Sequence, residues 1–600
     1  MCGIVGSINH YDIVPDLLEG LGNIEYRGYD SAGIAVLNNN ELTTIKRSGK
    51  LRNLAQELSL KPLSSHAGIG HTRWATHGKP NETNAHPHSN HDVSVVHNGI
   101  IENYLDLRNW LTAEGFRFQS DTDTEVIPHL ISLFLEQGLP PQEALNIALK
   151  HLDGAFAIGV LFRRDAEHLY AARRGSPLVL GQSDLGLCLG SDTMALTSSV
   201  DRVLYLEEGE QARLSRDHFC IIDANGQPIK REMKLFSHQI DSQSKQSHQF
   251  YMHKEIHQQA DTIRETFYHT QRQVPELPIN FKQLDRISIV ACGTSYYAAM
   301  VAKYWFEQIA KVPVDIDVAS EFRYRDPLLS PHGLSIFISQ SGETADTLAA
   351  LRYAKNQGQK ILSIVNVAGS TIARESHFSL QTQAGPEVGV ASTKAFTAQL
   401  AVLAKLALHT GHSRNAMSFS DASHLMQEIS TLPGLINMTL GVEDQFKTIG
   451  ESLKACSNAF FIGRGISYPL ALEGALKLKE ISYLHAEGFG AGELKHGPIA
   501  LIEPGVPVFV LAPSDSLLEK TLSNLEEVMA RGGRCIVLAD QRSCRHLPEN
   551  VESITLPDCD SRLTPILYAI AVQLIAYHAA LAIGTDVDQP RNLAKSVTVE

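Results

Sequence analysis

The sequence lacks the marks of several large protein classes. Its eight cysteines include no CxxC motif and no paired spacing, which argues against a secreted disulfide framework and favours a reducing cytoplasm. Acidic residues outnumber basic ones by 66 to 52, so nucleic acid is not expected as a partner, because phosphate binding needs a basic face. The start of the chain, MCGIVGSINH, has no basic region and is not expected to be a signal peptide.

Long apolar runs and nucleotide-binding loops are also missing. A membrane-spanning helix needs about 20 consecutive apolar residues. The most apolar stretch, 565–584, is interrupted by Gln573 and His578, so it predicts a buried helix and no membrane partner. No Walker-type loop occurs, and GRGISY (463–468) lacks the third glycine of a dinucleotide fingerprint. We therefore expect no cofactor.

The two parts of the chain follow different patterns. Residues 1 to about 215 hold short β-type runs such as SAGIAVL and VSVVHNGII, separated by glycine and asparagine, which predicts a largely β domain. The polar stretch 241–250, DSQSKQSHQF, is typical of a linker. From about residue 278, short apolar strands alternate with helical stretches, which predicts βα units and a parallel sheet.

The second part of the chain also repeats itself, because similar strand ends recur along it. Four pairs of positions recur at a separation of roughly 170 residues: Ser295 and Ser467, Glu321 and Glu487, Ser341 and Ser514, Asn366 and Asp540. Four matches at nearly one period predict two copies of one α/β domain.

Cys2 is the first candidate for catalysis. Gly3 follows it, and a small second residue permits removal of Met1. The thiol, with an ordinary pKa of about 8.5, would then lie beside a free α-amine of pKa about 7.7–8.0 that can act as its base. One residue would thus supply both nucleophile and base. Taken alone, however, a cysteine at position 2 is more often an ordinary one.

The surroundings of Cys2 strengthen this interpretation. Six motifs, in this order, resemble the class II glutamine amidotransferase domain with an N-terminal cysteine: MCGIVG, EYRGYDSAG (25–33), HTRWATHG (71–78), NAHPH (84–88), VHNGIIENY (96–104) and DTDTEV (121–126). The resemblance implies that Arg73 binds the glutamine α-carboxylate and Asp123 the α-ammonium. It also implies that Asn98 and the backbone N–H of Gly99 form the oxyanion hole. The residues implied around the pocket are Trp74, Thr76 and His77.

Seven histidines lie between positions 66 and 97, and the run H-P-H-x-x-H could suggest metal ligands. The run has no matching cysteine pair or carboxylate set, and the amidotransferase motifs already account for His71, His77, His86 and His97. We therefore predict structural histidines and no metal.

The loop SQSGET (339–344) is the main candidate in the second half. It follows a predicted strand and opens a helix, so backbone N–H groups and the hydroxyls of Ser339, Ser341 and Thr344 can form an anion site without a lysine. A plain serine-rich helix cap is the alternative interpretation of the loop alone. The two copies resemble sugar isomerase (SIS) domains in ACGTS, SQSGET, GVASTKAF (389–396), LEGALKLKE (472–480), AGELKHGP (491–498) and DQPRNLAKSVTVE (588–600).

Together, the two resemblances imply an enzyme that transfers the amide nitrogen of glutamine to fructose 6-phosphate and isomerises the product to glucosamine 6-phosphate. His496 suits ring opening, Glu480 suits the proton shift between C1 and C2, and Lys595 suits a Schiff base with the C2 ketone. Lys477 lies three residues before Glu480 on the same helical face and would orient it. The residues implied to hold the sugar phosphate are Ser295, Ser339, Gln340, Ser341, Thr344 and Val390.

We predict an α+β/α/β multidomain chain, in which an N-terminal Ntn-type αββα amidotransferase domain precedes two tandem SIS α/β domains with parallel sheets. The predicted divisions are 2–215 for the amidotransferase domain, 216–277 for a connecting segment, 278–418 and 450–590 for the SIS domains, 419–449 for connecting helices, and 591–600 for a tail that closes the sugar site. The family resemblance further implies a cytoplasmic homodimer in which His496 reaches the neighbouring subunit's site, and a dry ammonia tunnel that Trp74 gates.

Three other functions remain open at this point. A phosphoribosyl-pyrophosphate amidotransferase or an asparagine synthetase shares the first domain, but no SGGxDS-type loop occurs here. A sugar-phosphate-binding regulator could use SIS domains without aminotransferase chemistry, but it would want a basic helix-turn-helix. A simple SIS deglycase would lack the first 240 or so residues.

Overall fold

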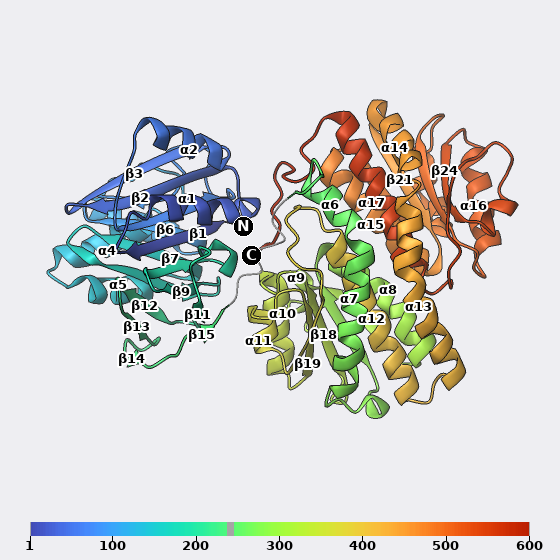
Figure 1. The fold of residues 1–600 in the computed structure, drawn as a ribbon, viewed down its shortest axis with the longest axis horizontal. Coiled ribbons are helices and arrows are strands. Elements are labelled where there is room, and N and C mark those ends of the chain that lie inside the picture. The colour runs from blue at the N-terminus through green and yellow to red at the C-terminus, as the bar shows by residue number, and fades with distance from the viewer. Residues whose placement is uncertain (1, 237–244, 599–600) are drawn as a thin grey trace. The chain divides into compact units, whose positions relative to one another are not determined.

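The computed structural model describes residues 2–236 and 245–598. The described chain forms two compact units, residues 1–241 with 594–600 and residues 242–593. Part of the predicted linker, 241–244, lies outside the described residues, as does Met1. The two units are drawn in Figure 1.

The first unit is built on two stacked antiparallel sheets. The first sheet has the order β15 (Lys234–Leu235), β11 (Arg202–Tyr205), β9 (Val179–Ser183), β10 (Gly186–Gly190), β1 (Gly3–Asn9), β4 (Ala67–Arg73), β2 (Ser31–Asn38), β3 (Glu41–Ser48). The second has the order β14 (Pro228–Ile229), β13 (Phe219–Ile222), β12 (Gln211–Leu214), β8 (Asp165–Arg174), β7 (Gly154–Phe162), β6 (Val93–Ile101), β5 (His88–Ser89). Between them lies an apolar core that includes Ile4, Ile69 and Ala157.

Helices cover the outer faces of these sheets. On the first sheet lie α1 (Val14–Asn23) and α2 (Leu51–Leu60), and on the second lie α3 (Tyr104–Ala113), α4 (Val126–Glu136) and α5 (Pro141–His151). Strand β1 is buried on both faces, and an added Cβ at its Gly6 would lie 3.1 Å from Leu169 Cδ2, on β8 of the second sheet. The close approach of the layers therefore depends on small residues. The predicted αββα arrangement is confirmed.

The second unit contains two parallel sheets of one topology. The first runs β17 (Val314–Val318), β16 (Ile287–Ala291), β18 (Leu334–Ser339), β19 (Lys360–Val365), β20 (Phe378–Gln381). The second runs β22 (His485–Gly490), β21 (Asn458–Gly463), β23 (Pro507–Ala512), β24 (Arg534–Asp540), β25 (Glu552–Leu556). The order is the same in both sheets, so the predicted duplication is confirmed.

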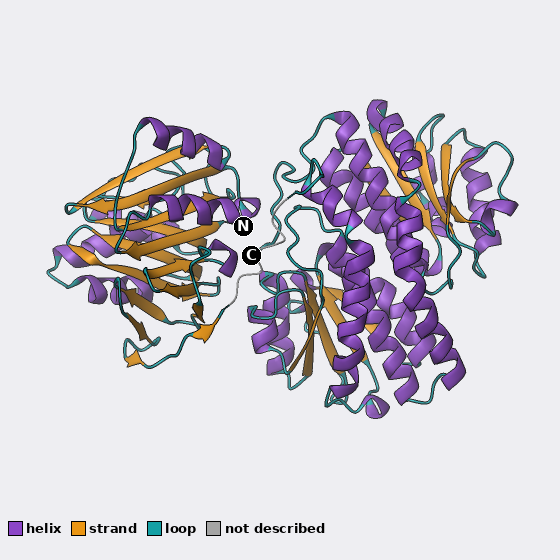
Figure 2. Cartoon of the chain, viewed as in Figure 1, coloured by secondary structure: helices purple, strands orange, loops and turns teal. Residues whose placement is uncertain are grey.

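Helices of both copies pack between these sheets, as Figure 2 shows. They are α8 (Gly293–Trp305) and α12 (Lys394–Ser413) of the first copy and α15 (Tyr468–Ser482) and α17 (Thr564–Ile583) of the second. The opposite faces are covered by α9 (Ala319–Phe322), α10 (Ala345–Asn356) and α11 (Thr371–Glu375) in the first copy and by α16 (Leu518–Met529) in the second. Helix α17 is long and apolar enough to cross a membrane by composition, but 83% of its most apolar window is buried inside the protein. The predicted buried helix is thereby confirmed.

The predicted connecting segments carry regular structure. Residues 216–277 hold the short strands β13, β14 and β15, which extend the sheets of the first unit, and the helices α6 (Tyr251–His257) and α7 (Gln259–Glu276) of the second. Residues 419–449 hold α13 (Phe419–Leu440) and the start of α14 (Glu443–Ser452). Helix α7 packs on α12 and α13, so it belongs to the core of the second unit.

Candidate active sites

Cys2 directly precedes the central strand β1 and faces the backbone of Trp74. The Trp74 N–H donates to Cys2 Sγ at 3.3 Å, and the thiol donates to the Trp74 carbonyl at 3.4 Å. Burial raises the pKa of the Cys2 thiol above its ordinary value. The thiol is therefore protonated near neutral pH, and a nucleophile in this position needs a base beside it.

Asn98, on β6, is fixed in one orientation by its two neighbours. Its Nδ2 donates to the Cys2 carbonyl at 3.0 Å, and its Oδ1 lies 3.1 Å from His71 Nε2. The same ring nitrogen lies 3.0 Å from the His97 carbonyl, and because both partners are acceptors it carries the proton. Burial lowers the pKa of His71 to about 3, so the ring stays neutral. The second hydrogen of Asn98 Nδ2 is available to a developing oxyanion near Cys2.

His71 was not among the predicted site residues, although its motif was recognised. His71 holds Asn98 by donating to its Oδ1. This contact depends on β4 and β6 lying close together in the fold, which the sequence alone does not reveal. Asp30 was missed for the same reason: its carboxylate accepts from the Ala75 N–H at 2.8 Å and shapes the loop after β4.

Gly99 occupies a backbone conformation that only glycine adopts without strain. Its φ is +146°, and an added Cβ would lie 1.9 Å from the carbonyl oxygen of Ala155 on β7. Backbone atoms cannot move aside as a flexible side chain can, so the position admits no side chain.

A Gly99→Ala variant should lose more than about 3 kcal/mol of unfolding free energy and most glutamine hydrolysis, because the methyl group displaces either β6 or β7. Chemical denaturation and a glutamate-release assay measure the two effects. Gly115→Ala is the matched control, since Gly115 has φ +97° but nothing within 4 Å of an added Cβ. Equal stability losses in the two variants would contradict this account.

Arg73 is buried under the loop that follows β4. Its guanidinium donates to the carbonyls of His77, Gly78 at 3.1 Å and Lys79 at 3.4 Å. The loop carries the predicted pocket residues Trp74, Thr76 and His77, of which Thr76 is exposed. The arginine therefore shapes the predicted pocket loop as well as lying at its base.

Asp123 is fixed by its own contacts and by those of the threonines on either side of it. Its Oδ2 accepts from the Ile101 N–H at 2.8 Å, and its Oδ1 lies 4.0 Å from His77 Nδ1. The flanking hydroxyls bind the ring nitrogens of two histidines: Thr122 Oγ1 lies 3.0 Å from His88 Nε2, and Thr124 Oγ1 lies 2.8 Å from His97 Nδ1. These contacts fix Asp123 near His77.

The buried rings of His71, His86, His88 and His97 form one packed group. The His71 and His86 centroids are 4.1 Å apart, and those of His86 and His88 are 4.8 Å apart. Burial lowers the pKa of each ring below its ordinary value. The group is neutral and holds strands and loops together by packing and hydrogen bonds.

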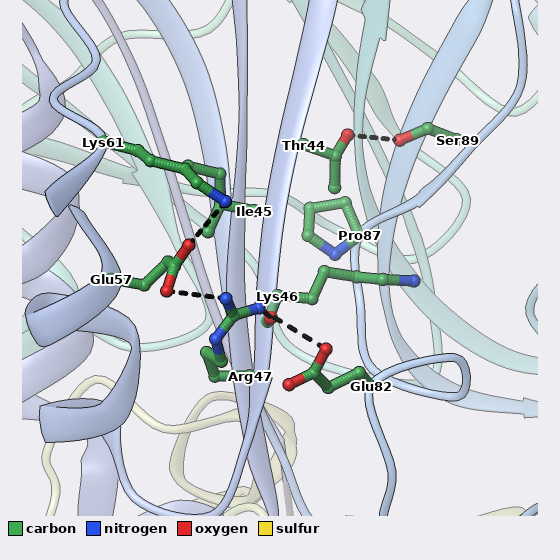
Figure 3. Close-up of a pocket in the computed structure, with 9 residues that line it drawn as sticks. All are labelled: Thr44, Ile45, Lys46, Arg47, Glu57, Lys61, Glu82, Pro87 and Ser89. Carbon is green, nitrogen blue, oxygen red and sulfur yellow. Dashed lines mark hydrogen bonds and ion pairs between the residues drawn. The ribbon is translucent and has the colours of Figure 1, made fainter.

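A separate pocket of about 350 Å³ opens on the first unit, beside β3 (Figure 3). Glu57 pairs with Arg47 at 2.6 Å and with Lys61 at 2.9 Å, and Arg47 also reaches Glu82 at 3.4 Å. Its charges are therefore largely satisfied by one another. None of the predicted site residues lines it.

The predicted sugar-phosphate residues of the second unit lie at the carboxyl ends of two neighbouring strands. Strands β16 and β18 pair in parallel, and the chain leaves β16 toward β17 on one side and β18 toward β19 on the other. Ligands of open α/β sheets bind at such a point, where the strand order reverses. Ser295 lies in the first turn of α8 after β16, and the SQSGET loop follows β18.

The SQSGET loop is tightly ordered by its own hydroxyls. Ser339 Oγ accepts from the Gly342 N–H at 3.0 Å and lies 2.9 Å from Thr344 Oγ1, while Ser341 Oγ accepts from the Glu343 N–H at 3.1 Å. Gly342 has φ +66°, and an added Cβ would lie 2.0 Å from Ser370 Oγ. The loop thus curls at the N-terminus of α10, where backbone N–H groups favour an anion.

A row of three charged residues on α15, in the second copy, lies beside the start of α8. Lys477 Nζ lies 2.6 Å from Glu480 Oε2 and 3.6 Å from Glu473 Oε1. The Thr294 hydroxyl, next to Ser295, donates to Glu473 at 3.0 Å. The packing of α15 on α8 therefore places Glu473 next to the predicted phosphate residue Ser295. Glu473 was not predicted; its position in LEGALKLKE, one turn before Lys477, was the available signal.

Burial raises the pKa of Glu473 to about 7, with the neighbouring Glu480 charge adding to the effect and Lys477 opposing it. The folded pKa lies above the unfolded one, so the folded protein holds this proton more tightly, and its contribution falls as pH rises from about 4.5 through 7. The change amounts to at most about 3 kcal/mol.

The unfolding free energy of the wild-type protein, relative to a Glu473→Gln variant, should therefore decrease between pH 5 and pH 8. Denaturant titrations at several pH values measure the difference, and Glu321→Gln, at an exposed carboxylate, is the control. A difference that is flat with pH would contradict a raised pKa at Glu473.

The segment around Val390 is held by two residues that sequence reasoning missed, Glu255 through its carboxylate and Asp588 through its backbone carbonyl. Glu255 Oε1, on α6, accepts from the N–H groups of Val388 at 2.5 Å and Gly389 at 3.3 Å. The Val390 N–H donates to the Asp588 carbonyl at 3.1 Å, while the Asp588 carboxylate accepts from the first residues of α6. Helix α6 and the start of the tail therefore fix the Val390 segment.

Two further predicted catalytic residues belong to other elements than α15. His496 ends the short helix Ala491–His496 and is exposed in the single chain. Lys595 belongs to the segment 594–600, which forms part of the first unit. The tail before it is anchored beside Glu480's helix, because the Arg591 N–H donates to the Tyr483 hydroxyl at 2.7 Å.

Comparisons with known proteins agree with these two kinds of site. Residues 71–198 match the family described as a glutamine amidotransferase domain, and residues 280–409 and 452–583 match the SIS domain family. The fold and the sites define a glutamine amidotransferase domain joined to two SIS domains, and the predicted fold class is confirmed.

Full-length relatives narrow this class further. Glutamine–fructose-6-phosphate aminotransferases (isomerizing) of Brucella suis and Mesorhizobium japonicum are 51% and 49% identical over 100% of both chains. The C-terminal domain of glucosamine-fructose-6-phosphate aminotransferase from Francisella tularensis is 42% identical, has a TM-score of 0.56, and covers 58% of this chain and 100% of its own. The chain belongs to the glutamine–fructose-6-phosphate aminotransferase (isomerizing) family.

Proposed function

We propose that the chain converts fructose 6-phosphate and glutamine into glucosamine 6-phosphate and glutamate, with Cys2 as the nucleophile. The observation that carries the glutamine half is the fixed contact of Asn98 Nδ2 with the Cys2 carbonyl, 3.0 Å apart. Family membership and the Lys477–Glu480 pair on α15, which packs on α8 beside Ser295, support the sugar half.

In the first unit, the Cys2 thiol attacks the side-chain amide carbon of glutamine after Met1 is removed. The α-amine of Cys2 takes the thiol proton and passes it to the leaving ammonia, which breaks the C–N bond and leaves a thioester. Asn98 Nδ2 and the Gly99 N–H stabilise the oxyanion of each tetrahedral intermediate. Water then hydrolyses the thioester and releases glutamate.

Arg73 and Asp123 bind the two charged groups of the glutamine backbone in this proposal. A guanidinium offers the α-carboxylate a planar pair of donors, and a carboxylate suits the α-ammonium. Trp74, Thr76 and His77 close the pocket from the loop that Arg73 shapes.

In the second unit, the phosphate is bound by Ser295 and by the loop residues Ser339, Gln340, Ser341 and Thr344. His496 opens the furanose ring by proton transfer, and Lys595 holds the C2 ketone as a Schiff base with loss of water. Ammonia replaces the lysine at C2. Glu480, oriented by Lys477, then removes a proton from C1 and returns one to C2, which yields the amino aldose.

We also propose that the working form is a homodimer in which His496 serves the neighbouring subunit's sugar site. His496 is exposed on its short helix and makes none of the described contacts with Glu480. A second copy of the chain is the simplest surface against which an exposed acid–base group would act.

The proposal is tested by incubating the purified protein with both substrates and measuring the two products together. Glucosamine 6-phosphate and glutamate should form in equal amounts. Formation of glutamate without any amino sugar would support a glutaminase alone, and binding of fructose 6-phosphate without turnover would support a regulator. Either outcome would overturn the proposed reaction.

A further inference from the structure

Three histidines of the second unit contact one carboxylate, that of Glu443, and a fourth, His248, contacts one of the three. His253 and His257 lie one turn apart on α6, and His248 lies just before that helix. Glu443 begins α14, and His578 lies on α17. All five side chains come from the second unit, and none belongs to either proposed active site.

The first three histidines have the geometry of metal ligands. One ring nitrogen of each of His248, His253 and His257 lies within 4.8 Å of the others, and within the described ranges 2–236 and 245–598 this is the one such group of His, Cys, Asp or Glu. The Nδ1 atoms of His248 and His253 face each other at 2.9 Å. A histidine pair at positions i and i+4 of a helix is a spacing that binds zinc in other proteins.

The remaining nitrogens of the helical pair are already held by oxygen acceptors. His253 Nε2 lies 2.9 Å from Glu443 Oε1, and His257 Nδ1 lies 3.0 Å from the His253 carbonyl. A metal-bound histidine usually donates its other ring N–H to a carboxylate or a backbone carbonyl, which fixes the tautomer and the ring direction. These contacts leave His253 Nδ1 and His257 Nε2 to face an ion, and at His257 the ion would replace the contact of Nε2 with Glu443 Oε2 at 3.1 Å.

Glu443 contacts three of the histidines. Its carboxylate also lies 2.8 Å from His578 Nε2 and 3.1 Å from His257 Nε2. A carboxylate in contact with two of the three rings offsets part of the charge of a cation that they bind.

A purely structural hydrogen-bond network is the competing explanation. It accounts for the contacts of Glu443 but gives no reason for three imidazoles whose ring centroids lie 4.4 to 5.2 Å apart. One metal ion bound by all three rings accounts for this spacing.

We propose that His248, His253 and His257 bind one divalent transition-metal ion of the zinc type, with Glu443 as the partner that orients the ligands. Three neutral imidazoles and no thiolate suit Zn²⁺, Co²⁺ or Ni²⁺ rather than Ca²⁺ or Mg²⁺. The fourth position of a tetrahedral ion falls to water. The ion fastens α6, whose Glu255 holds the segment before Val390, to α14 and α17.

Zinc titration of the full-length protein, stripped of metal by a chelator, tests the site by calorimetry. We expect one Zn²⁺ per chain bound by these rings, and a loss of at least about 100-fold in affinity when His253→Gln and His257→Gln are combined. The matched control combines His332→Gln and His485→Gln, two exposed histidines of the same unit, and should bind as the wild type does.

A second variant keeps the test decisive if the double variant folds poorly. Glu443→Gln preserves all the rings but removes the orienting charge, and should weaken zinc binding about 10- to 100-fold. Co²⁺ titration separates this site from Cys2, because nitrogen ligands give no thiolate-to-cobalt charge-transfer band. Equal zinc affinity in the wild type and both variants, or a bound Co²⁺ with a thiolate band alone, would overturn the proposal.

Discussion

A Cys2→Ala variant should lose glutamine-dependent synthesis of glucosamine 6-phosphate by at least about 1,000-fold, because no other group can form the thioester. The thiol lies against the Trp74 backbone at 3.3 Å, and alanine leaves that position without a nucleophile. Any synthesis that the wild type shows with added ammonium in place of glutamine should persist in the variant, because ammonium needs no thioester. Product formation is measured separately with glutamine and with ammonium, and the two rates are compared.

Cys220→Ala is the control for this variant. Cys220 lies on the short strand β13 and is partly buried. It is not among the residues proposed to bind the substrate glutamine. It should retain both activities. Wild-type synthesis by Cys2→Ala with glutamine as the sole nitrogen source would refute the assignment of the nucleophile.

A Lys595→Arg variant should hydrolyse glutamine yet form almost no amino sugar, with a loss of at least about 1,000-fold in synthesis. A guanidinium keeps the positive charge but stays protonated at any working pH, so it cannot form a Schiff base. Separate assays of glutamate release and amino sugar formation show the difference. Borohydride trapping of fructose 6-phosphate on the wild-type protein, followed by peptide mass spectrometry, locates the bond.

Lys479→Arg is the control for the lysine. Lys479 is exposed on α15 beside Glu480, so it carries the same charge as Lys595 but takes no part in the proposed chemistry. It should keep both activities. Full synthesis by Lys595→Arg, or a trapped sugar on another lysine, would exclude the Schiff-base role.

The overall fold was predictable because short-range patterns of apolar and polar residues along the sequence indicate its strands and helices. Alternating apolar strands and helices predicted parallel sheets, and the recurrence of Ser295 at Ser467 predicted two copies, which the identical strand orders confirm. The strands β13 to β15 were not foreseen within 216–277. Each has only two to four residues, and such short strands form by pairing with strands that precede them in the chain.

The supporting residues of the sites were harder to predict than the reacting ones. Cys2 and the SQSGET loop stand in recognisable motifs, whereas His71 and Glu473 act through contacts made only after folding. The histidine cluster shows the same limit. The spacing of His248, His253 and His257 is visible in the sequence, but Glu443 is nearly 200 residues away.

The account's central claim is that nitrogen freed at Cys2 becomes the amino group of the sugar. Glutamine labelled with nitrogen-15 in its amide, supplied with fructose 6-phosphate and an excess of unlabelled ammonium, tests it most directly. Mass spectrometry of the product should show nearly complete labelling of the amino group. Labelling diluted to the isotope ratio of the bulk ammonium would contradict the claim, because the sugar site would then draw its nitrogen from solution.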